Sequence, residues 1–494
     1  MEITRSNFNR SLQVVLESIE DCDYVAIDTE FTGLRGGSLE SKPHRFDSLE
    51  DRYQKIRANC EKHWMCQLGL CTFKYLPEQN RYLARPFNIY VIPYSRMREL
   101  TVSPSSMMFL VENGFDMNRL FAEGVKCCRL TELQSNLNHP GSFESGFAVS
   151  QEHQKLLQEY TDTILEFLGT SEKAIKIPIK NNYLKKLFFG NYGVQKCFQN
   201  LDFTVETQSG EILVKVSKLK RKKAVFIPQE STQPTELEHN LKKSDMLGAT
   251  MIFCAVLHHK KPVVGHNLIY DLAFLYSHFI TDLPPTVREF NEALAKVFPP
   301  IFDTKYIAKQ IGEKKLILNT GLSSLFRSCQ KRIQPINPVT VEFDSAFKEY
   351  SGEEKEHEAG YDAYVTGYIM AVLTNYLASK QEVPISQVND LLCNKVSLSD
   401  HYLPYIDINS PVQEQRVFDH RVLKLVSLNN KELKEVIEDV ARFGDAYVLR
   451  VGTNCYFADF EIFSEGFNIK KVVQALNEQG EYQAFEYVDR DKLS

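Results

Sequence analysis

Apolar and polar residues recur along the chain with two periods, which together predict an α/β protein. Residues 7–19 carry apolar side chains at helical spacing. Three apolar runs follow, at 24–28, 67–73 and 87–92, and their length and composition predict buried strands. A helix followed by three strands, the first of which ends in an acid, indicates the opening half of a mixed sheet.

A second segment, at about 151–240, differs in composition. It opens with a helical pattern at 152–168 and contains a predicted strand at 211–216. Around the end of that strand lies a basic cluster, which comprises Lys215, Lys218, Lys220, Arg221, Lys222 and Lys223. We interpret the segment as a small α/β module with a basic face, inserted into the larger sheet domain.

The α/β pattern resumes at 241–385, so that 1–150 and 241–385 are predicted to be the two halves of one core. Predicted helices at 246–259 and 361–378 belong to the second half. The last segment, 405–494, alternates strand, helix, strand, strand, helix and strand. That order is the layout of a ferredoxin-like or RNA-recognition-motif domain.

Composition narrows the class of protein further. Of 494 residues, 43% are hydrophobic and 25% are charged, as in ordinary globular proteins. The formal charge of −6 excludes a uniformly basic nucleic-acid binder, so phosphate contacts require local patches. No apolar run is long enough for a membrane helix, and the N-terminus lacks the apolar region of a signal peptide. The 11 irregularly spaced cysteines favour reduced thiols. We therefore expect an intracellular protein, in the cytoplasm, the nucleus or both.

Two acids end the first predicted strand. Asp28 and Glu30 stand two residues apart, so their side chains point to the same side of the strand. Two carboxylates on one face repel each other unless they share a cation, and oxygen ligands suit Mg²⁺ or Mn²⁺. The alternative is a strand that simply runs into a solvated acidic loop.

Later acids complete the candidate set. Asp271 follows a predicted turn at 265–267 and falls early in a helix, where an ordinary acid would also be stabilised by the helix dipole. Gly360 indicates that His357 lies on a loop while Asp362 lies in the first turn of a helix. The alternative for His357 is a surface position among the neighbouring acids.

The order of these residues resembles the DEDDh nucleases. In such a site four carboxylates hold two divalent cations ~3.5–4 Å apart, and a histidine near neutral pKa is a suitable general base. Here the four carboxylates are Asp28, Glu30, Asp271 and Asp362, and the candidate base is His357.

The chain as a whole resembles the poly(A)-specific ribonuclease family, which includes the enzymes that trim piRNA precursors. The matching passages are MEITRSNF at 1–8, AIDTEFTGL at 26–34, RYQKIR at 52–57, QLGLCTFKY at 67–75, VVGHNLIYD at 263–271, FDTK at 302–305 and HEAGYDAYVTG at 357–367. The resemblance spans essentially all of 1–494. It implies a ribonuclease-H-like core with an inserted module, the four carboxylates as ligands of two Mg²⁺ ions (Mn²⁺ as a substitute), His357 as the base, single-stranded RNA 3′ ends as substrate and a homodimer.

Several family features are missing or altered. The inserted segment has no clear Arg-x-x-x-His nucleic-acid signature, so its RNA role rests on lysines and aromatic residues. Deadenylases stack an mRNA cap on a Trp of the C-terminal module, whereas Trp64 is the only Trp here. Tyr447, Tyr456 and Phe457 are the alternative stacking residues. The trimming branch commonly ends in a membrane helix, and this sequence shows none.

Four further residues receive individual interpretations. Phe31 follows the paired acids and is a candidate wedge against the terminal base. Tyr364 and Tyr368 are interpreted as core aromatics of a helix. Asp303 is expected to fix local backbone rather than to bind metal.

The sequence favours a 3′→5′ exoribonuclease that shortens poly(A) tails. Trimming of small non-coding RNA precursors, such as piRNA intermediates, is the alternative within the same chemistry. A catalytically inert RNA-binding scaffold is the alternative of another class. Against it stands the complete set of acids, because buried unpaired carboxylates destabilise a fold and an inert descendant tends to lose at least one of them. A DNA exonuclease is also compatible with the catalytic set, because contacts to the 2′-OH are not visible in the sequence.

Overall fold

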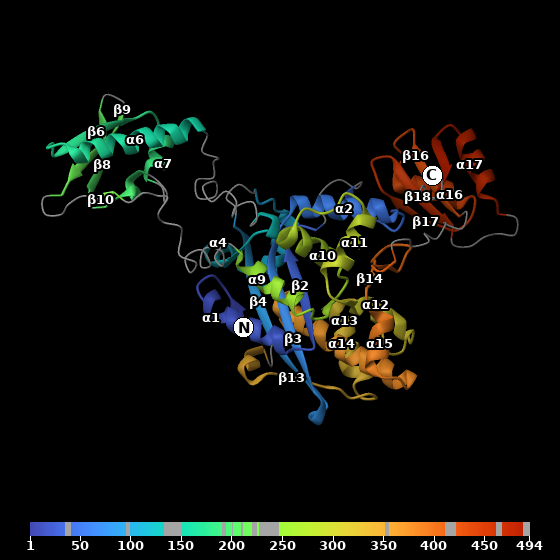
Figure 1. Cartoon of the computed structure of the whole chain (residues 1–494). Coiled ribbons are helices and arrows are strands. Elements are labelled where there is room, and N and C mark those ends of the chain that lie inside the picture. Colours follow the sequence, from blue (N-terminus) through green and yellow to red (C-terminus); the bar gives the residue numbers. More distant parts are fainter. Residues whose placement is uncertain are drawn as a thin grey trace. The chain divides into compact units, whose positions relative to one another are not determined.

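The chain forms two compact units in the computed structural model. One unit comprises Met1–Pro93, Leu100–Cys127 and Gly248–Ser494, and the other comprises Tyr94–Glu99 and Cys128–Leu247. Figure 1 shows the elements of both units. The structure describes residues 1–34, 41–94, 99–132, 151–189, 194–199, 201–208, 211–219, 225–226, 247–350, 355–410, 421–460 and 467–487.

A mixed sheet of ten strands, counted over the described residues, forms the centre of the first unit. The strand order is β1-β4-β3-β2-β11-β12-β14-β15, and β5 and β13 pair with β4. The strands are β1 Glu2–Ile3, β2 Tyr24–Phe31, β3 Met65–Leu76, β4 Arg81–Pro93, β5 Val125–Cys127, β11 Val263–Gly265, β12 Ile301–Asp303, β13 Thr340–Phe343, β14 Lys395–Ser397 and β15 Tyr405–Asp407. This confirms the predicted mixed α/β fold.

The sheet topology brings distant parts of the chain to one edge. β2, β3 and β4 are antiparallel neighbours. β2, β11, β12 and β14 run parallel to one another in that order. The carboxyl ends of these four strands therefore lie at the same edge of the sheet, which in α/β proteins is the edge that carries ligand sites.

Helices cover both faces of this sheet. They are α1 Phe8–Asp21, α2 Leu49–Lys62, α3 Pro104–Glu112, α4 Met117–Glu123, α9 Ala249–His258, α10 Ile269–Leu275, α11 Val287–Val297, α12 Thr304–Ile311, α13 Leu322–Ser328, α14 Ala359–Gln381 and α15 Ile385–Leu392. Alternate residues of β2 enter two separate hydrophobic clusters, Val25 and Ile27 on one face and Tyr24 and Ala26 on the other. The central strands are largely apolar because both of their faces are buried.

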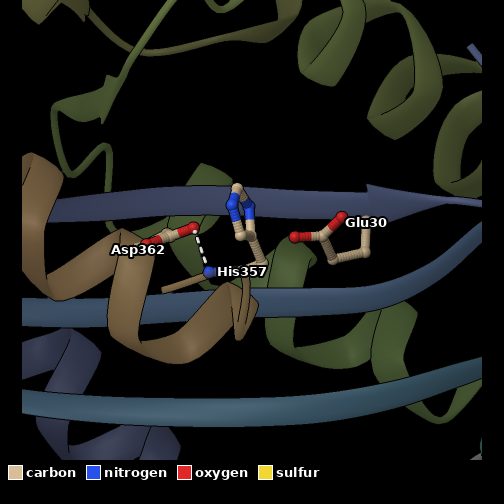
Figure 2. Close-up of side chains that lie close together, drawn as sticks. All are labelled: Glu30, His357 and Asp362. Carbon is tan, nitrogen blue, oxygen red and sulfur yellow. Dashed lines mark hydrogen bonds between the residues drawn. The ribbon is translucent and has the colours of Figure 1, made fainter. Parts of the chain in front are cut away.

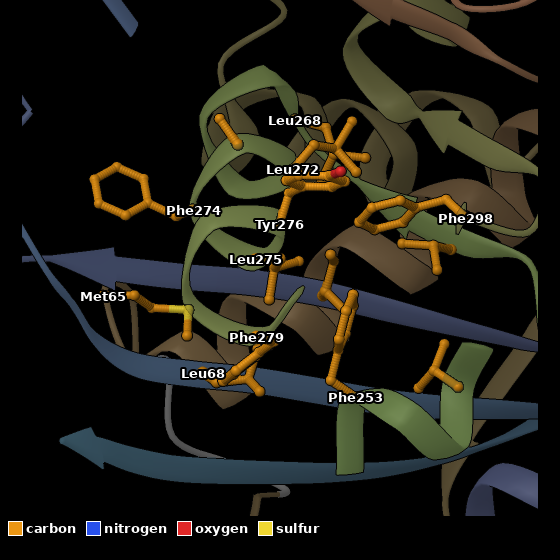
Figure 3. Packing of buried hydrophobic residues seen from close by; sticks show 14 of the residues in the cluster. Met65, Leu68, Phe253, Leu268, Leu272, Phe274, Leu275, Tyr276, Phe279 and Phe298 are labelled. Atoms are coloured by element: carbon orange, nitrogen blue, oxygen red, sulfur yellow. The ribbon is translucent and has the colours of Figure 1, made fainter. Parts of the chain in front are cut away.

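The two clusters have different helical partners. The first cluster packs α1, α2, α9, α10 and α11 against the sheet. Figure 3 shows part of it, with Leu275 and Phe279 beside Leu68 of β3. The second cluster packs α12, α13, α14 and α15 against the opposite face. Tyr368 is buried in the second cluster and Tyr364 packs against it, which confirms both as core aromatics.

The second unit is a small α/β module. Its three-stranded antiparallel sheet has the order β6-β9-β8. A core that includes Ile164, Phe188 and Val214 joins the sheet to helices α6 and α7. The elements are α6 Gln151–Gly169, β6 Ala174–Ile179, α7 Asn182–Phe189, β8 Leu201–Gln208 and β9 Glu211–Lys218, together with the short pair β7 Phe198–Gln199 and β10 Val225–Phe226. The predicted helix at 152–168 and strand at 211–216 are confirmed.

The chain leaves the first unit and returns to it at adjoining points. Cys127 and Gly248 form an antiparallel β-bridge. Gly248 has φ 44°, and a Cβ at this position would lie 1.9 Å from the carbonyl oxygen of Lys126. A residue with a side chain is therefore excluded at this junction.

The C-terminal part of the first unit has the predicted order of elements. β16 Val422–Ser427, α16 Leu433–Ala441, β17 Ala446–Arg450, β18 Cys455–Phe460, α17 Ile469–Glu478 and β19 Tyr482–Glu486 form a four-stranded antiparallel sheet with the order β17-β18-β16-β19. Both helices pack on one face through residues that include Val440 and Leu476. We call this part the C-terminal module.

The second face of the C-terminal sheet is covered around Phe457. The Phe457 ring stacks on Phe46, which precedes α2, with centroids 4.8 Å apart and planes 12° apart. Phe457 and Tyr456 are 4% and 0% exposed, so neither presents a ring for cap stacking, which corrects that expectation. Tyr447 remains exposed. Trp64 is buried in the core. Among the described residues, no helix combines the length and the apolar character needed to cross a membrane.

Candidate active site

The paired acids of β2 face the helix that carries the last acid of the set. Asp28 and Glu30 continue the every-second-residue series of Tyr24 and Ala26 on the strand, so they point toward the sheet face that α14 covers. Asp362 lies in the first turn of α14, as predicted. The two acids of β2 and the helix N-terminus therefore meet at the carboxyl edge of the sheet.

Three of the five predicted residues form a compact ligand set. Glu30, His357 and Asp362 each place a ligand atom within 4.8 Å of the others. Figure 2 shows the imidazole of His357 between the carboxylates of Asp362 and Glu30. Two carboxylates and an imidazole are donors that a divalent cation accepts, so this cluster is a candidate metal site.

Asp28 and Asp271 belong to the same electrostatic cluster. Burial, followed by the charges of Asp362, Glu30 and Asp271, raises the pKa of Asp28 well above its ordinary value. Burial, followed by Asp362 and Asp271, does the same to the pKa of Glu30. These four carboxylates destabilise one another when all are ionised, and a shared cation would relieve that repulsion.

The pKa values of the other two acids, Asp271 and Asp362, are also raised. Burial raises the pKa of Asp271 to about 7, against a hydrogen bond from the Thr29 hydroxyl that lowers it. Burial also raises the pKa of Asp362 to about 7, with further increases from Glu356 and Glu358. Both side chains are 8% exposed. The donor set thus fits divalent cations by charge and by hard oxygen chemistry.

The N-terminus of α14 is held against the sheet by two side-chain amides. The Gln67 side-chain oxygen accepts a hydrogen bond from the Ala359 N–H at 3.0 Å. The Asn88 side-chain oxygen accepts one from the Gly360 N–H at 3.2 Å. The N-cap residue Glu358 makes no side-chain cap. The sheet therefore supplies acceptors for helix N–H groups that would otherwise be unsatisfied.

A glycine makes this close approach possible. Gly69 of β3 stands between Asp28 of β2 and Asn88 of β4 in the sheet register. A Cβ on Gly69 would lie 1.8 Å from the carbonyl oxygen of Ala359. The helix backbone therefore rests directly on the strand backbone at the residue that neighbours Asp28.

Thr29 positions the acid that comes from α10. Its hydroxyl donates a hydrogen bond to Asp271 Oδ1 at 2.5 Å. Because Thr29 lies between Asp28 and Glu30 on β2, its side chain points to the opposite face. The strand β2 thus carries two acids on one face, and from its opposite face it holds a third acid, Asp271.

His357 is oriented by an unusual backbone conformation. Its φ is 69°, in the left-handed region that is uncommon for residues with a side chain. The His357 N–H donates to Asp362 Oδ2 at 3.1 Å. Its ring meets Phe109 of α3 edge-on, with centroids 4.7 Å apart. These contacts keep the imidazole at the carboxylate cluster.

Asp303 anchors backbone, as expected. Its carboxylate oxygens accept five backbone hydrogen bonds, from Asn267, Leu268, Lys305, Tyr306 and Ser397. These donors lie after β11, at the start of α12 and in β14, so one carboxylate joins the ends of three parallel strands. All of its acceptor capacity is used within the protein.

The remaining predicted contacts with RNA receive less support. Phe31 is 7% exposed and packs on Phe274 at 4.2 Å between ring centroids, so it belongs to the core and offers no free face to a base. Lys218 donates to Thr170 O at 2.6 Å and lies over the Phe167 ring. Lys215 lies in β9, while the predicted residues Lys220, Arg221, Lys222 and Lys223 fall outside the described residues.

Three positioning residues were not predicted from the sequence. Gln67 and Asn88 are polar residues within otherwise apolar strands, and that departure from the pattern is the signal that marks them. Thr29 offers no comparable signal, since threonine is common in strands.

Comparison with known proteins identifies the family of the chain. A family model described as CAF1 family ribonuclease matches residues 3–370. The chain therefore belongs to the CAF1 family of ribonucleases. It is 31% identical over 416 residues to the poly(A)-specific ribonuclease PARN of Xenopus laevis, a match that covers 79% of this chain and 65% of the relative. The chain thus spans about two-thirds of that relative.

Two further comparisons differ in coverage. The chain is 25% identical to the pre-piRNA 3′-exonuclease trimmer of Bombyx mori, over 99% of this chain and 93% of that protein. A structure of S. pombe Pop2p in a Mg²⁺- and Mn²⁺-bound form is a distant likeness, with a TM-score of 0.39, 15% identity and coverage of 80% of this chain and 97% of that one.

Proposed function

We propose that this CAF1-family chain is a divalent-metal-dependent 3′→5′ exoribonuclease. The observation that carries the proposal is the cluster of Asp28, Glu30, Asp271 and Asp362, whose pKa values are all raised by burial, with mutual repulsion adding to the shifts of Asp28 and Glu30. Such a cluster is costly without a function, and groups with strongly shifted pKa values gather at catalytic sites. We assign the four carboxylates as metal ligands.

The chain's residues divide the chemistry between them. Asp28, Glu30, Asp271 and Asp362 would hold two Mg²⁺ ions, or Mn²⁺ in their place, and such ions stabilise charge on a scissile phosphate and lower the pKa of a bound water. An imidazole nitrogen of His357 accepts the proton of the attacking water. The water oxygen bonds to phosphorus, the P–O3′ bond breaks, and the leaving 3′ oxygen takes up a proton from solvent, while the proton held by His357 returns to solvent. Gln67 and Asn88 keep α14, and with it Asp362, in place.

Poly(A) tails are the proposed substrate. The Xenopus relative is named for poly(A) and is 31% identical to this chain. Trimming of small-RNA precursors is the second candidate. It is favoured by one specific observation, the alignment of the Bombyx trimmer over 99% of this chain and 93% of its own length. Single-stranded RNA 3′ ends are common to both activities.

The other parts of the chain receive supporting roles in this proposal. Residues 1–150 and 241–385 form a ribonuclease-H-like nuclease core, 151–240 form an inserted module that contacts RNA through lysines such as Lys215, and 405–494 form an RNA-recognition-motif-like domain. The βαββαβ order and the strand order of the C-terminal module support the last assignment. We further propose a homodimer that acts inside the cell, in the cytoplasm, the nucleus or both.

A gel time course tests the activity. Purified protein with Mg²⁺ is given 5′-labelled RNAs that end in about 20 adenosines, in uridines or in mixed sequence. Asp28→Ala is the inactive control, and it should remain folded and retain most of its RNA binding. A ladder that shortens from the 3′ end only on the adenosine substrate indicates a deadenylase.

The other outcomes of this experiment are equally informative. Similar ladders on all three RNAs favour a general trimmer whose specificity comes from partners. Wild-type activity in Asp28→Ala would rule out the assigned site. RNA binding without a ladder on any substrate would support the scaffold alternative.

A further inference from the structure

A basic cavity lies at the carboxyl edge of the sheet that also carries the candidate active site. Its volume is about 400 Å³, within the range of small-ligand sites, roughly 300–1,000 Å³. The walls come from the segment before α2, from α12 and from the turn between β14 and β15. The charged side chains in its wall are Arg45, Lys305, Lys309 and Asp400. We call it the basic pocket.

The cations of the basic pocket are poorly neutralised. Arg45 and Lys305 make no ion pair within the described part of the chain. Among the described residues, Lys309 donates to two neutral oxygens, Ser397 Oγ at 3.0 Å and Pro404 O at 3.4 Å. The guanidinium of Arg45 is held between two rings, 5.0 Å from the Tyr402 centroid and 5.2 Å from that of Tyr447. Three cations thus share the pocket wall with one carboxylate, that of Asp400.

Two of these cations repel each other. Lys305 and Lys309 are one turn apart on α12, a spacing at which like charges are neighbours and destabilise the helix. Burial lowers the pKa of both ammonium groups, and the charge of Lys305 lowers the pKa of Lys309 further, while the nearby Asp303 carboxylate acts in the opposite direction on both. A bound anion would reduce this repulsion.

His401, although it lines the pocket, has no free ring nitrogen to offer. Its Nε2 lies 2.9 Å from Asp47 O, and its Nδ1 accepts from the Leu403 N–H at 2.9 Å. Burial lowers the pKa of His401 to about 4, so the ring is neutral near pH 7. The lysines and Arg45 are therefore the cationic groups of the pocket wall.

The place of the pocket in the sheet points to its ligand. α12 begins at the carboxyl end of β12, which is separated from the acid-bearing β2 by β11 alone. Neighbouring strands are ~4.8 Å apart, so the pocket begins on the order of 10 Å along the same edge from Asp28 and Glu30. A polynucleotide whose 3′ end lies at those acids reaches this distance within a few nucleotides.

We propose that the basic pocket binds a phosphate group, and that this group is a backbone phosphate of the RNA strand upstream of the cleaved bond. The proposal rests on the exoribonuclease function proposed above. A free nucleotide is the other source of the same phosphate chemistry. RNA is favoured because the pocket and the carboxylate cluster share one edge of the sheet and are opposite in charge. An RNA strand requires both features, since its scissile bond lies at the metal ions and its upstream phosphates need cations.

Binding measured without catalysis tests the proposal. Full-length protein in EDTA is titrated into fluorescein-labelled oligoadenylates of about 3 and about 8 nucleotides, and the Kd is followed by anisotropy at several salt concentrations. In wild type the longer RNA binds more tightly. In Lys309→Gln and Arg45→Gln we expect that gain to shrink roughly three- to tenfold, and the slope of log K against log salt to fall by about 0.7 for each lost contact.

Matched controls separate this role from general effects. Lys434→Gln removes a lysine whose side chain is 88% exposed on α16, and it should match wild type. Thermal unfolding establishes that each variant is folded. A ladder on the short RNA with Mg²⁺ reports the proposed function independently, because the pocket need not be filled for cleavage of that substrate.

Two results would overturn the inference. If Lys309→Gln, Arg45→Gln and Lys434→Gln all bind both RNAs as wild type does, the pocket is not an RNA phosphate site. Binding of free AMP to the same proteins is measured by calorimetric titration. If the variants keep the gain with RNA length but lose the AMP binding that wild type shows, the phosphate source is a free nucleotide and the RNA assignment is wrong. Absence of any ladder with wild type would instead count against the exoribonuclease function.

Discussion

Gln67 and Ala359 join the sheet to the helix that completes the site, through a hydrogen bond of 3.0 Å from the Ala359 N–H to the Gln67 side-chain oxygen. Gln67 stands directly opposite Glu30 in the sheet. The residue that positions α14 is thus the cross-strand neighbour of a carboxylate in the cluster. Movement of this helix end alters the distance between Glu30 and Asp362.

Substitution Gln67→Ala should weaken metal binding more than it weakens the fold. The loss leaves the Ala359 N–H without its acceptor, at a cost of about 1–2 kcal/mol. We expect a higher Mg²⁺ concentration for half-maximal activity and a lower kcat, with KM for RNA little changed. Gln13→Ala, which removes an exposed hydrogen bond to Glu17 on α1, is the matched control. Equal Mg²⁺ requirements in the two variants would contradict the positioning role.

The carboxylate cluster should make stability depend on pH in the absence of metal. The pKa values of Asp271 and Asp362 are raised to about 7 from 3.8. A raised pKa means that the folded state binds the proton more tightly than the unfolded state. The contribution of each group to stability is therefore complete below about pH 4 and is lost as the pH rises through about 7.

Asp28→Asn removes one charge from this cluster. In EDTA at pH 8 the variant should exceed wild type in stability by on the order of 1–2 kcal/mol, and the difference should shrink toward pH 4. Thermal unfolding across pH measures this, with Asp390→Asn on α15 as the exposed control. Added Mg²⁺ should stabilise wild type more than the variant. A less stable Asp28→Asn protein at pH 8 in EDTA would be inconsistent with the repulsion.

Gly69→Ala should displace α14 or unfold the core. The added Cβ would lie 1.8 Å from Ala359 O, and the backbone there cannot move aside as a flexible side chain would. We expect a loss of at least about 2 kcal/mol in the free energy of unfolding, together with lost activity. Gly169→Ala, at a glycine with no atom within 4 Å of the added Cβ, is the control. Urea denaturation gives both values, and a normal Gly69→Ala protein would refute the close contact.

The substitution Asp303→Asn tests whether Asp303 holds the backbone, as we infer, or binds metal. An amide can supply only one acceptor oxygen, so several of the five backbone N–H groups lose their partner, at about 2–4 kcal/mol in total. The folded fraction should retain its Mg²⁺ affinity within about twofold, as measured by calorimetric titration. A loss of tenfold or more would mean that Asp303 binds metal directly.

The sequence predicted what depends on local pattern. The strands around Asp28, the first turn of α14 and the alternation of the C-terminal module follow from periodicity and glycine placement, and the structure confirms them. The roles of Gln67 and Asn88 depend instead on which strands are neighbours and on their register, which no local window contains. Phe31 was misjudged for the same reason, because its burial against Phe274 comes from the packing of α10.

The bridge between Cys127 and Gly248 has a consequence for the history of the chain. The residues between these points begin and end within the width of a single strand pair, so a core without them has only a short gap to close. The free-energy cost of closing a loop depends only weakly on its length, since each doubling of the length adds only about 0.6 kcal/mol. An ancestral core could therefore have acquired, exchanged or shed its second unit as a cassette, with the carboxylates of β2, α10 and α14 left undisturbed.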